Sequence, residues 1–234
     1  MVNAMRHYKD NASEYDKIQR ELSEVRHYFE TASRKVQKEM LFDSTVFAVM
    51  SVQNSINILE RAFRAYDRSD SWKDVQDAMM HVNYGNNKMN YIEHNHEVIM
   101  SDSKEIIDSL ERGDVWLAVR RIVEKLKGVS WIKGAFVPAM LGFTEVMCID
   151  TNVAQMVPDE SVQASEYKTE EEYQDAVSRV MEEFPDLSEE LSPFMLQWVI
   201  FDANRDQGVA RHEEWFNAIL PGSSFSRQAS LNSF

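Results

Sequence analysis

Cysteine, glycine and proline are all scarce in this sequence. The 234 residues include one cysteine, Cys148, together with seven glycines and five prolines. A single thiol excludes an intramolecular disulfide and any zinc or iron–sulfur site built from several cysteines, and it is typical of reducing compartments. We therefore expect an intracellular protein whose fold does not depend on disulfides.

Long apolar runs are absent as well. No run approaches the roughly 20 residues that span a bilayer, and the N-terminus (MVNAMRHYKD) lacks the apolar core of a signal peptide. Hydrophobic residues nevertheless make up 44% of the chain, which is enough to fill the interior of a globular protein. The sequence thus predicts a soluble protein without a membrane partner.

Positive charge is in short supply. Lysine and arginine number 25 against 39 aspartates and glutamates, a net charge of −14, which argues against a nucleic-acid-binding protein. The charges are segregated, however. Residues 120–133 carry five basic residues and one acidic residue, whereas residues 159–190 carry twelve acidic residues and two basic ones. A basic face can therefore coexist with the overall acidity.

Helical periodicity dominates what is present. Apolar residues recur at three- and four-residue spacing without convincing strand patterns, which predicts an all-α fold. Asp43 and Ser44 offer an N-cap for a markedly apolar helix. Residues 221–234 are rich in serine and have no periodicity, so we expect a flexible tail. The expected helices cover residues 13–40, 45–66, 72–82, 88–100, 103–112, 114–125, 131–141, 169–184, 192–204 and 211–220.

The segment from Leu126 to Gln155 is the most informative. It predicts a tight turn at residues 128–130 between two helices, and backbone N–H groups at the start of a helix are suited to binding a phosphate. Flanking lysines add attraction to a nucleic-acid backbone. Asp150 follows an apolar stretch, where a carboxylate is costly unless it is paired, caps a helix or has a function.

Three segments, in this order along the chain, resemble the helix-hairpin-helix (HhH-GPD) DNA glycosylases. Residues 50–55 (MSVQNS) are similar to the family's L-S-x-Q-x-T/S, and residues 83–92 (NYGNNKMNYI) to its G-x-Y-x-x-K-A-x-x-I. The third segment is similar to the family's hairpin L-P-G-V-G-x-x-T-A and the following V-D-x-H/N-V-x-R. Its matching residues are Leu126, Gly128, Val129, Ile149, Asp150, Asn152 and Val153.

The resemblance implies a two-lobed, all-α fold with a central cleft, in one domain over residues 1–220. The middle lobe would cover about 67–150, with the hairpin at 126–134, and the other lobe would combine 1–66 with 151–220. It also implies an enzyme of base excision repair that flips a damaged or modified base out of DNA and hydrolyses its N-glycosidic bond. Such an enzyme would be a cytoplasmic or nucleoid-associated monomer with DNA as its partner.

The resemblance also assigns roles to residues. Asp150 matches the catalytic aspartate, whose carboxylate stabilises the sugar cation and positions water. Gln53 matches a residue that helps fill the gap left by the flipped base. No metal or other cofactor is implied. The other implied DNA contacts are Asn54, Lys88, Lys127, Gly128, Val129 and Ser130, and Tyr84 and Trp131 are candidates for stacking on the base.

The sequence departs from the family at several positions. Relatives that also cut the DNA strand carry a nucleophilic lysine where this chain has Ile132. Lys133 is one residue later, which rotates a side chain by about 100° on a helix. Lys133 stays a candidate catalytic residue, with a phosphate contact as its alternative, and a monofunctional reaction is favoured. Ser130 replaces the second hairpin glycine, and Lys127 replaces the proline.

Alternatives remain open for both the residues and the protein. Asp150 has an ordinary explanation as the N-cap of the next helix, and Tyr84 and Trp131 have one as core aromatics. The altered hairpin and the acidity also fit an enzyme of the same fold that modifies bases, as in thymine hypermodification of phage DNA. A third possibility is a helical DNA-binding module without catalysis.

Overall fold

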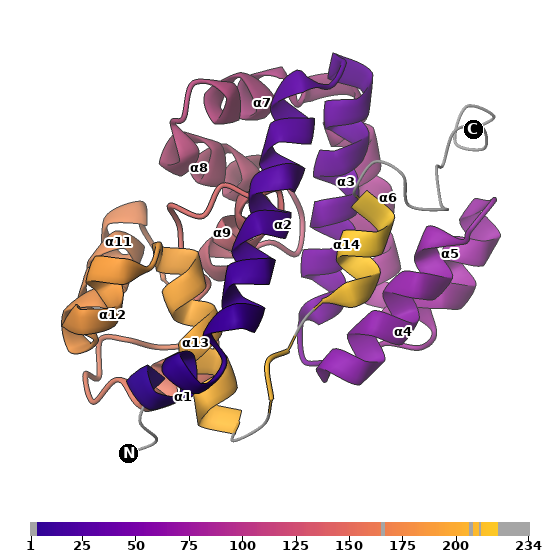
Figure 1. The fold of residues 1–234 in the computed structure, drawn as a ribbon. Helices are drawn as coiled ribbons and strands as arrows, with labels where there is room; N and C mark the ends of the chain where they lie inside the picture. Colours follow the sequence, from indigo (N-terminus) through magenta and orange to yellow (C-terminus); the bar gives the residue numbers. More distant parts are fainter. Residues whose placement is uncertain (1–3, 165–166, 206–207, 211, 220–234) are drawn as a thin grey trace.

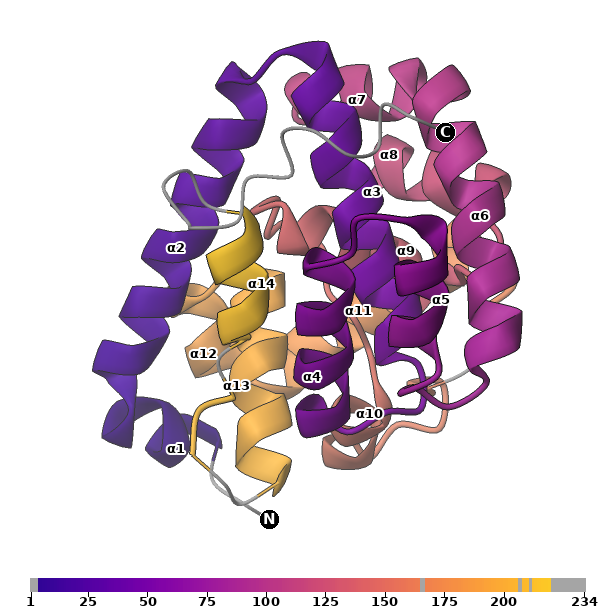
Figure 2. The same ribbon diagram turned by 90° about the vertical axis from the view of Figure 1, so that its right-hand side faces the viewer.

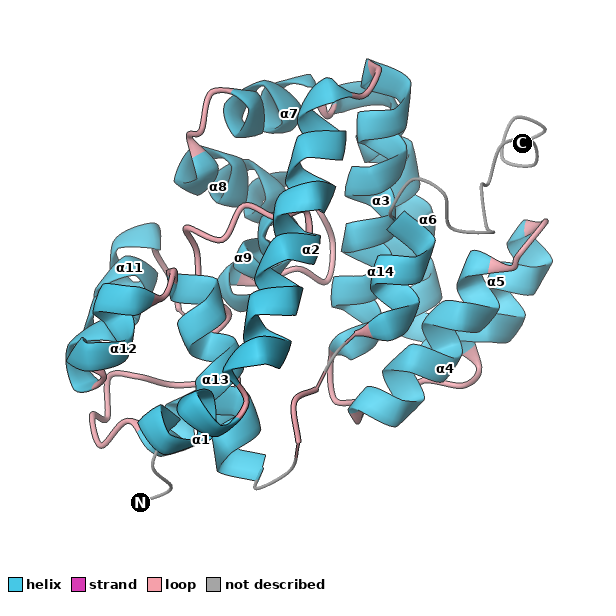
Figure 3. Cartoon of the chain, in the orientation of Figure 1, coloured by secondary structure: helices cyan, strands magenta, loops and turns pink. Residues whose placement is uncertain are grey.

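The computed structural model describes residues 4–164, 167–205, 208–210 and 212–219. Within these residues the chain forms helices and no strands, as Figure 3 shows. The predicted tail lies outside the described residues. The helices are α1 (Ala4–Asp10), α2 (Ala12–Thr31), α3 (Arg34–Ser51), α4 (Ile56–Asp67), α5 (Trp72–Met79), α6 (Gly85–Asp102), α7 (Lys104–Glu111), α8 (Val115–Lys125), α9 (Trp131–Met140), α10 (Thr151–Met156), α11 (Glu170–Glu183), α12 (Pro185–Glu190), α13 (Pro193–Arg205) and α14 (Glu213–Ile219).

The first half of the chain breaks at other places than the sequence predicted. One helix was expected to end at residue 40 and the next to begin at 45, but α3 runs through both positions and α2 ends at Thr31. Ser33 supplies the real N-cap, because its hydroxyl accepts from the Val36 N–H. Inside α3, Asp43 accepts from the Tyr66 hydroxyl at 2.8 Å and Ser44 donates to the Val137 carbonyl at 2.7 Å. Both polar side chains therefore make tertiary contacts rather than a cap.

Three short helices were not among the expected elements: α1, α10 and α12. Helix α1 has seven residues, and α10 and α12 have six each, which is too few for a clear apolar period. Pro185 occupies the first position of α12, where its fixed φ angle favours helix initiation. Short elements of this kind are specified mainly by their packing partners, as when α10 and α1 both pack on α13.

The long helix α3 lies at the centre of the molecule. Most of its C-terminal half is buried, and it packs against α4, α6 and α9. The amphipathic helix α2 lies on the outside of the molecule; it meets α3 at the turn that joins them and then diverges from it (Figures 1 and 2). The buried face of α2 alternates three- and four-residue steps, through Tyr15, Ile18, Leu22, Val25 and Phe29.

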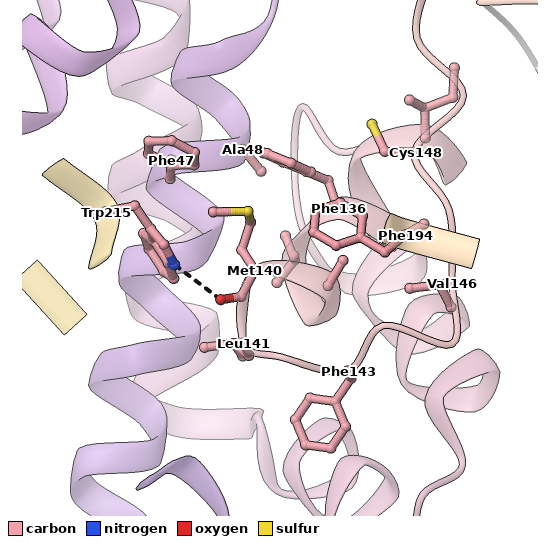
Figure 4. Packing of buried hydrophobic residues seen from close by; sticks show 14 of the residues in the cluster. Phe47, Ala48, Phe136, Met140, Leu141, Phe143, Val146, Cys148, Phe194 and Trp215 are labelled. Carbon is pink, nitrogen blue, oxygen red and sulfur yellow. Dashed lines mark hydrogen bonds between the residues drawn. The ribbon is translucent and has the colours of Figure 1, made fainter. Parts of the chain in front are cut away.

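Aromatic rings join helices that are distant in sequence (Figure 4). Phe47 of α3 stacks on Phe136 of α9 with ring centroids 6.0 Å apart, and Phe136 meets Phe194 of α13 at 6.1 Å. Trp215 of α14 lies 5.3 Å from Phe47, and its indole N–H donates to the Met140 carbonyl at 3.1 Å. This core fixes α9, which carries one side of the hairpin, relative to the C-terminal helices.

Candidate functional site

The predicted hairpin is present as α8, a turn at residues 126–130, and α9. Gly128 has a φ of +73°, and a Cβ atom there would lie 2.3 Å from the ring of Tyr91. A Cβ at Gly134 would lie 2.6 Å from the side chain of Val123 on α8, so the two helices of the hairpin approach closely. Any larger residue at these two positions would force the turn or the helix pair apart.

A buried amide holds the hairpin turn on α6. The Asn95 side chain accepts from the Lys127 N–H at 2.8 Å and donates to the Lys127 carbonyl at 3.0 Å. Asn95 is completely buried, so these two bonds satisfy a polar group that water cannot reach. Sequence reasoning missed Asn95. Its place between Ile92 and Ile99, on the buried side of α6, is the signal that could have found it.

The loop after α3 is joined to the loop before α6. The Asn83 amide donates to the Gln53 carbonyl at 2.7 Å, and the Asn54 amide oxygen accepts from the Asn83 N–H at 3.1 Å. Gln53 and Tyr84 have φ angles of +57° and +58°, an unusual conformation for residues with side chains. Asn54 therefore uses its side chain within the protein, while Gln53 occupies a strained position in the joined loops.

Exposed apolar side chains occur close together in sequence around the loop that precedes α6. Met80, Tyr84 and Tyr91 are the large hydrophobic residues that the described part of the chain exposes, at 66%, 65% and 37%. Tyr84, a candidate for stacking on a base, is the N-cap residue of α6 and lies at the surface rather than in a pocket. Trp131, the other candidate, is half-buried at the start of α9 and packs against the core.

Lys88 is a buried base. Only 4% of it is exposed, and its ammonium donates to the Val52 carbonyl at 2.6 Å. Burial, and secondarily the charge of Lys133, lowers the pKa of Lys88 to about 8. Among the described residues no carboxylate pairs with it. Lys88 thus binds carbonyl groups at the end of α3, immediately before Gln53. Its ammonium is not at the surface.

Asp150 caps α10 with one of its two carboxylate oxygens. Oδ1 accepts from the N–H groups of Asn152 and Val153, at 2.9 and 3.0 Å. The interpretation of Asp150 as an N-cap is therefore correct. Within the described residues no donor binds Oδ2, and the residue is half-buried. The cap orients the carboxylate and leaves one oxygen available to a ligand.

The charges of Lys133 and Asp150 both act on the buried thiol of Cys148. Burial raises the pKa of the Cys148 thiol to about 11, the Lys133 ammonium acts against this shift, and the Asp150 carboxylate adds to it. Lys133 also lowers the pKa of Lys88, and its ammonium lies 5.1 Å from the centre of the Phe136 ring. The Lys133 ammonium thus influences both Lys88, in the first turn of α6, and Cys148, two residues before Asp150. Ile132, its neighbour, is buried.

Much of the basic segment is neutralised by nearby acids. Arg120 pairs with Glu170 at 2.5 Å, Arg121 with Glu105 and Glu124, and Lys125 with Asp102 at 2.8 Å. In contrast, neither Lys127 nor Lys133 forms an ion pair with a described residue. The free positive charge of residues 120–133 is thus concentrated at the hairpin. Val129, between them in the turn, is buried, and Ser130 is the N-cap residue of α9.

The described residues contain no cluster of three or more histidine, cysteine, aspartate or glutamate side chains arranged to bind a metal. His96, half of the H-x-H pair at residues 94–96, packs edge-on against Phe42 and Trp72. Burial lowers the pKa of this histidine. None of the described helices is long and apolar enough to cross a membrane.

Comparison with known proteins identifies a structural relative. No protein-family model matches the chain, and no curated protein matches it significantly. Among solved structures, the 8-oxoguanine DNA glycosylase of Thermotoga maritima is similar, with a TM-score of 0.66 and 14% sequence identity. The alignment covers 89% of this chain and 96% of that chain. The similarity extends over nearly the whole protein and confirms the all-α fold that the three motifs indicated: this chain shares the fold of that DNA glycosylase.

Proposed function

We propose that the protein is a monofunctional DNA glycosylase that hydrolyses the N-glycosidic bond of a damaged or modified base. The observation that carries the proposal is the geometry of Asp150, whose Oδ1 is bound by the cap while Oδ2 has no donor among the described residues. A fixed carboxylate of this kind is suited to stabilising the positive charge that develops on the sugar. The fold similarity to a DNA glycosylase supports the same assignment.

The chemistry follows from that carboxylate. The bond from the sugar C1′ to the base nitrogen breaks, and the base leaves with the electron pair and takes up a proton. Water then adds its hydroxyl group to C1′, and its second proton passes to solvent through Asp150. The hairpin contributes binding: the backbone N–H groups at the turn and the charge of Lys127 hold a phosphate of the DNA.

The two joined loops that carry Gln53 and Tyr84 would contact the DNA duplex. Gln53 lies in a strained turn, and the exposed side chain of Tyr84 belongs to the loop bonded to it. We propose that Gln53 fills the gap left by the flipped nucleotide and that Tyr84 stacks on a neighbouring base. Trp131 is proposed to line the base pocket from the start of α9.

An excision assay tests the proposal. Duplex and single-stranded oligonucleotides would carry uracil, alkylated bases, hydroxymethylated bases or 8-oxoguanine, the base named for the similar structure. Strand cleavage that requires subsequent alkali is the expected product of a monofunctional enzyme. Asp150→Asn should abolish it, because asparagine is also a good N-cap residue but carries no charge.

Asp114→Asn is the matched control. Asp114 caps α8 by accepting from the Leu117 N–H at 3.3 Å, so the substitution also removes a charge from an N-cap. This variant should keep full activity. If no oligonucleotide is cleaved, and Asp150→Asn binds DNA as the wild type does, the result would contradict excision and favour a non-catalytic module. A base of increased mass in treated DNA would instead favour base modification.

A further inference from the structure

The segment that leads to Asp150 has no regular structure of its own. Residues 147–150 lie between a turn and α10, and all of them except Asp150 are buried. Buried backbone N–H and C=O groups outside helices and sheets need other partners. Within the segment, the Asp150 N–H donates to the Cys148 carbonyl at 2.9 Å. The remaining groups have to be satisfied by side chains from elsewhere.

Two buried side chains supply partners for three of these groups. The Tyr173 hydroxyl on α11 donates to the Met147 carbonyl at 2.6 Å and accepts from the Ile149 N–H at 3.2 Å. Gln197 on α13 accepts from the Cys148 N–H at 3.0 Å through Oε1. Three consecutive residues immediately before Asp150 are therefore bound by two helices that follow it in the sequence.

Tyr173 is well suited to this double role. Its ring is completely buried and is contacted edge-on by Tyr167 and Trp116, at centroid distances of 4.8 and 6.1 Å. Burial is also the main reason that the pKa of this phenol is raised well above its ordinary value. The hydroxyl consequently keeps its proton, so it donates one hydrogen bond and accepts the other at every physiological pH.

We propose that Tyr173 and Gln197 are positioning residues for the Asp150 carboxylate. The inference rests on the proposed function, since it assigns Asp150 to the reacting sugar. Neither residue touches the substrate. Both fix the backbone from which Asp150 projects, and a displacement of a catalytic group by about 1 Å costs on the order of 100-fold in rate.

Tyr173→Phe tests the first residue because it removes only the hydroxyl. The single-turnover excision rate should fall by about 10- to 100-fold, while the dissociation constant for DNA stays that of the wild type. Tyr66→Phe is the control: Tyr66 is equally buried, and its hydroxyl donates to Asp43, a contact made by other helices. An unchanged rate in Tyr173→Phe, or an equal loss in Tyr66→Phe, would overturn the proposal.

Gln197 offers a rescue test. Gln197→Met has a similar shape but no oxygen to accept from the Cys148 N–H, so it should lose activity as Tyr173→Phe does. Gln197→Glu retains an acceptor oxygen at that place and should keep a rate within a fewfold of the wild type. Loss of activity in both variants, with folding intact, would show that the hydrogen bond is not what matters at Gln197.

Hydrogen exchange separates this inference from the proposed function. Peptides covering residues 146–153 should exchange faster in Tyr173→Phe than in the wild type or Tyr66→Phe. If the wild type excises no base, the proposed function fails, and the exchange data alone decide whether Tyr173 holds the segment. If it does excise a base, unchanged exchange together with an unchanged rate would refute the positioning role alone.

Discussion

Lys133 is the residue at which catalysis and binding have to be distinguished. Ile132, at the position of the family's nucleophilic lysine, is buried and carries no amine. The wild type should therefore cut no strand without alkali, and sodium borohydride should trap no covalent complex with DNA. Lys133→Gln should weaken DNA binding but keep alkali-dependent excision. A borohydride-trapped complex that disappears in Lys133→Gln would overturn the monofunctional assignment.

Asp202 should make the stability of the protein depend on pH. It is completely buried, accepts from the Tyr15 hydroxyl and the Ala210 N–H, and burial raises its pKa from 3.8 to about 6. Because the folded state binds this proton more tightly than the unfolded state, the contribution is complete below pH 4 and is lost as the pH rises through 6. The loss amounts to about 3 kcal/mol by pH 7.

Asp202→Asn should remove most of that dependence, since asparagine keeps an acceptor and has no charge to bury. Urea unfolding at pH 4.5, 6 and 7.5 provides the measurement. The difference in free energy of unfolding between wild type and variant should shift in favour of the variant as the pH rises. A difference that stays constant over this range would show that Asp202 does not carry the effect.

At the scale of the elements, the hairpin turn depends on Gly128. Gly128→Ala should cost about 2–5 kcal/mol, because it combines a positive φ angle with a Cβ that meets the Tyr91 ring. Gly113→Ala is a matched control: Gly113 has a φ of +75° and no atom within 4 Å of its Cβ position, so only about 1–2 kcal/mol is expected.

The two variants should differ in DNA binding as well. Gly128→Ala displaces the turn that is proposed to hold a phosphate, so its affinity for DNA should fall even at temperatures where it is fully folded. Gly113→Ala, in the turn between α7 and α8, should bind like the wild type. Thermal unfolding and fluorescence anisotropy measure the two effects, and equal DNA affinity in both variants would argue against a role for the turn.

Helix boundaries illustrate what local patterns decide. The helices from residue 104 to 140 begin and end within one residue of the expected positions. Two of them, α7 and α8, have a clear apolar face, and Asp114 caps α8. The expected break near Asp43 was wrong. A polar residue in an apolar helix has the same sequence signature whether it caps a helix end or bonds to another helix, as Ser44 does with Val137.

At the scale of the whole molecule, net charge and local charge oppose each other. A chain of charge −14 repels DNA, so the proposed DNA binding would rely on cations that are not paired internally. Lys127→Gln should lower the slope of log affinity against log salt by about 1, the value for one phosphate contact. Lys125→Gln, which removes a lysine already paired with Asp102, should change the slope less. Equal changes in the salt slope of the two variants would contradict the idea that only unpaired lysines contact DNA.

The sequence by itself determined the helical class and the hairpin, and it offered an N-cap as one explanation of Asp150. These features depend on short-range spacing: apolar periods, a glycine where the backbone needs a positive φ angle, and a carboxylate two and three residues before the N–H groups it caps. Such information is contained within a few turns of chain, so one sequence is enough to read it.

Only the tertiary structure decided which polar residues hold the segments of the candidate site in place. Asn95 holds the hairpin across 32 residues, and Tyr173 holds the segment before Asp150 across more than 20. Arg120 is neutralised by Glu170, fifty residues away. A buried polar side chain looks like any other in sequence, because its value comes from the partner that folding brings to it, and that partner is fixed by the packing of the helices.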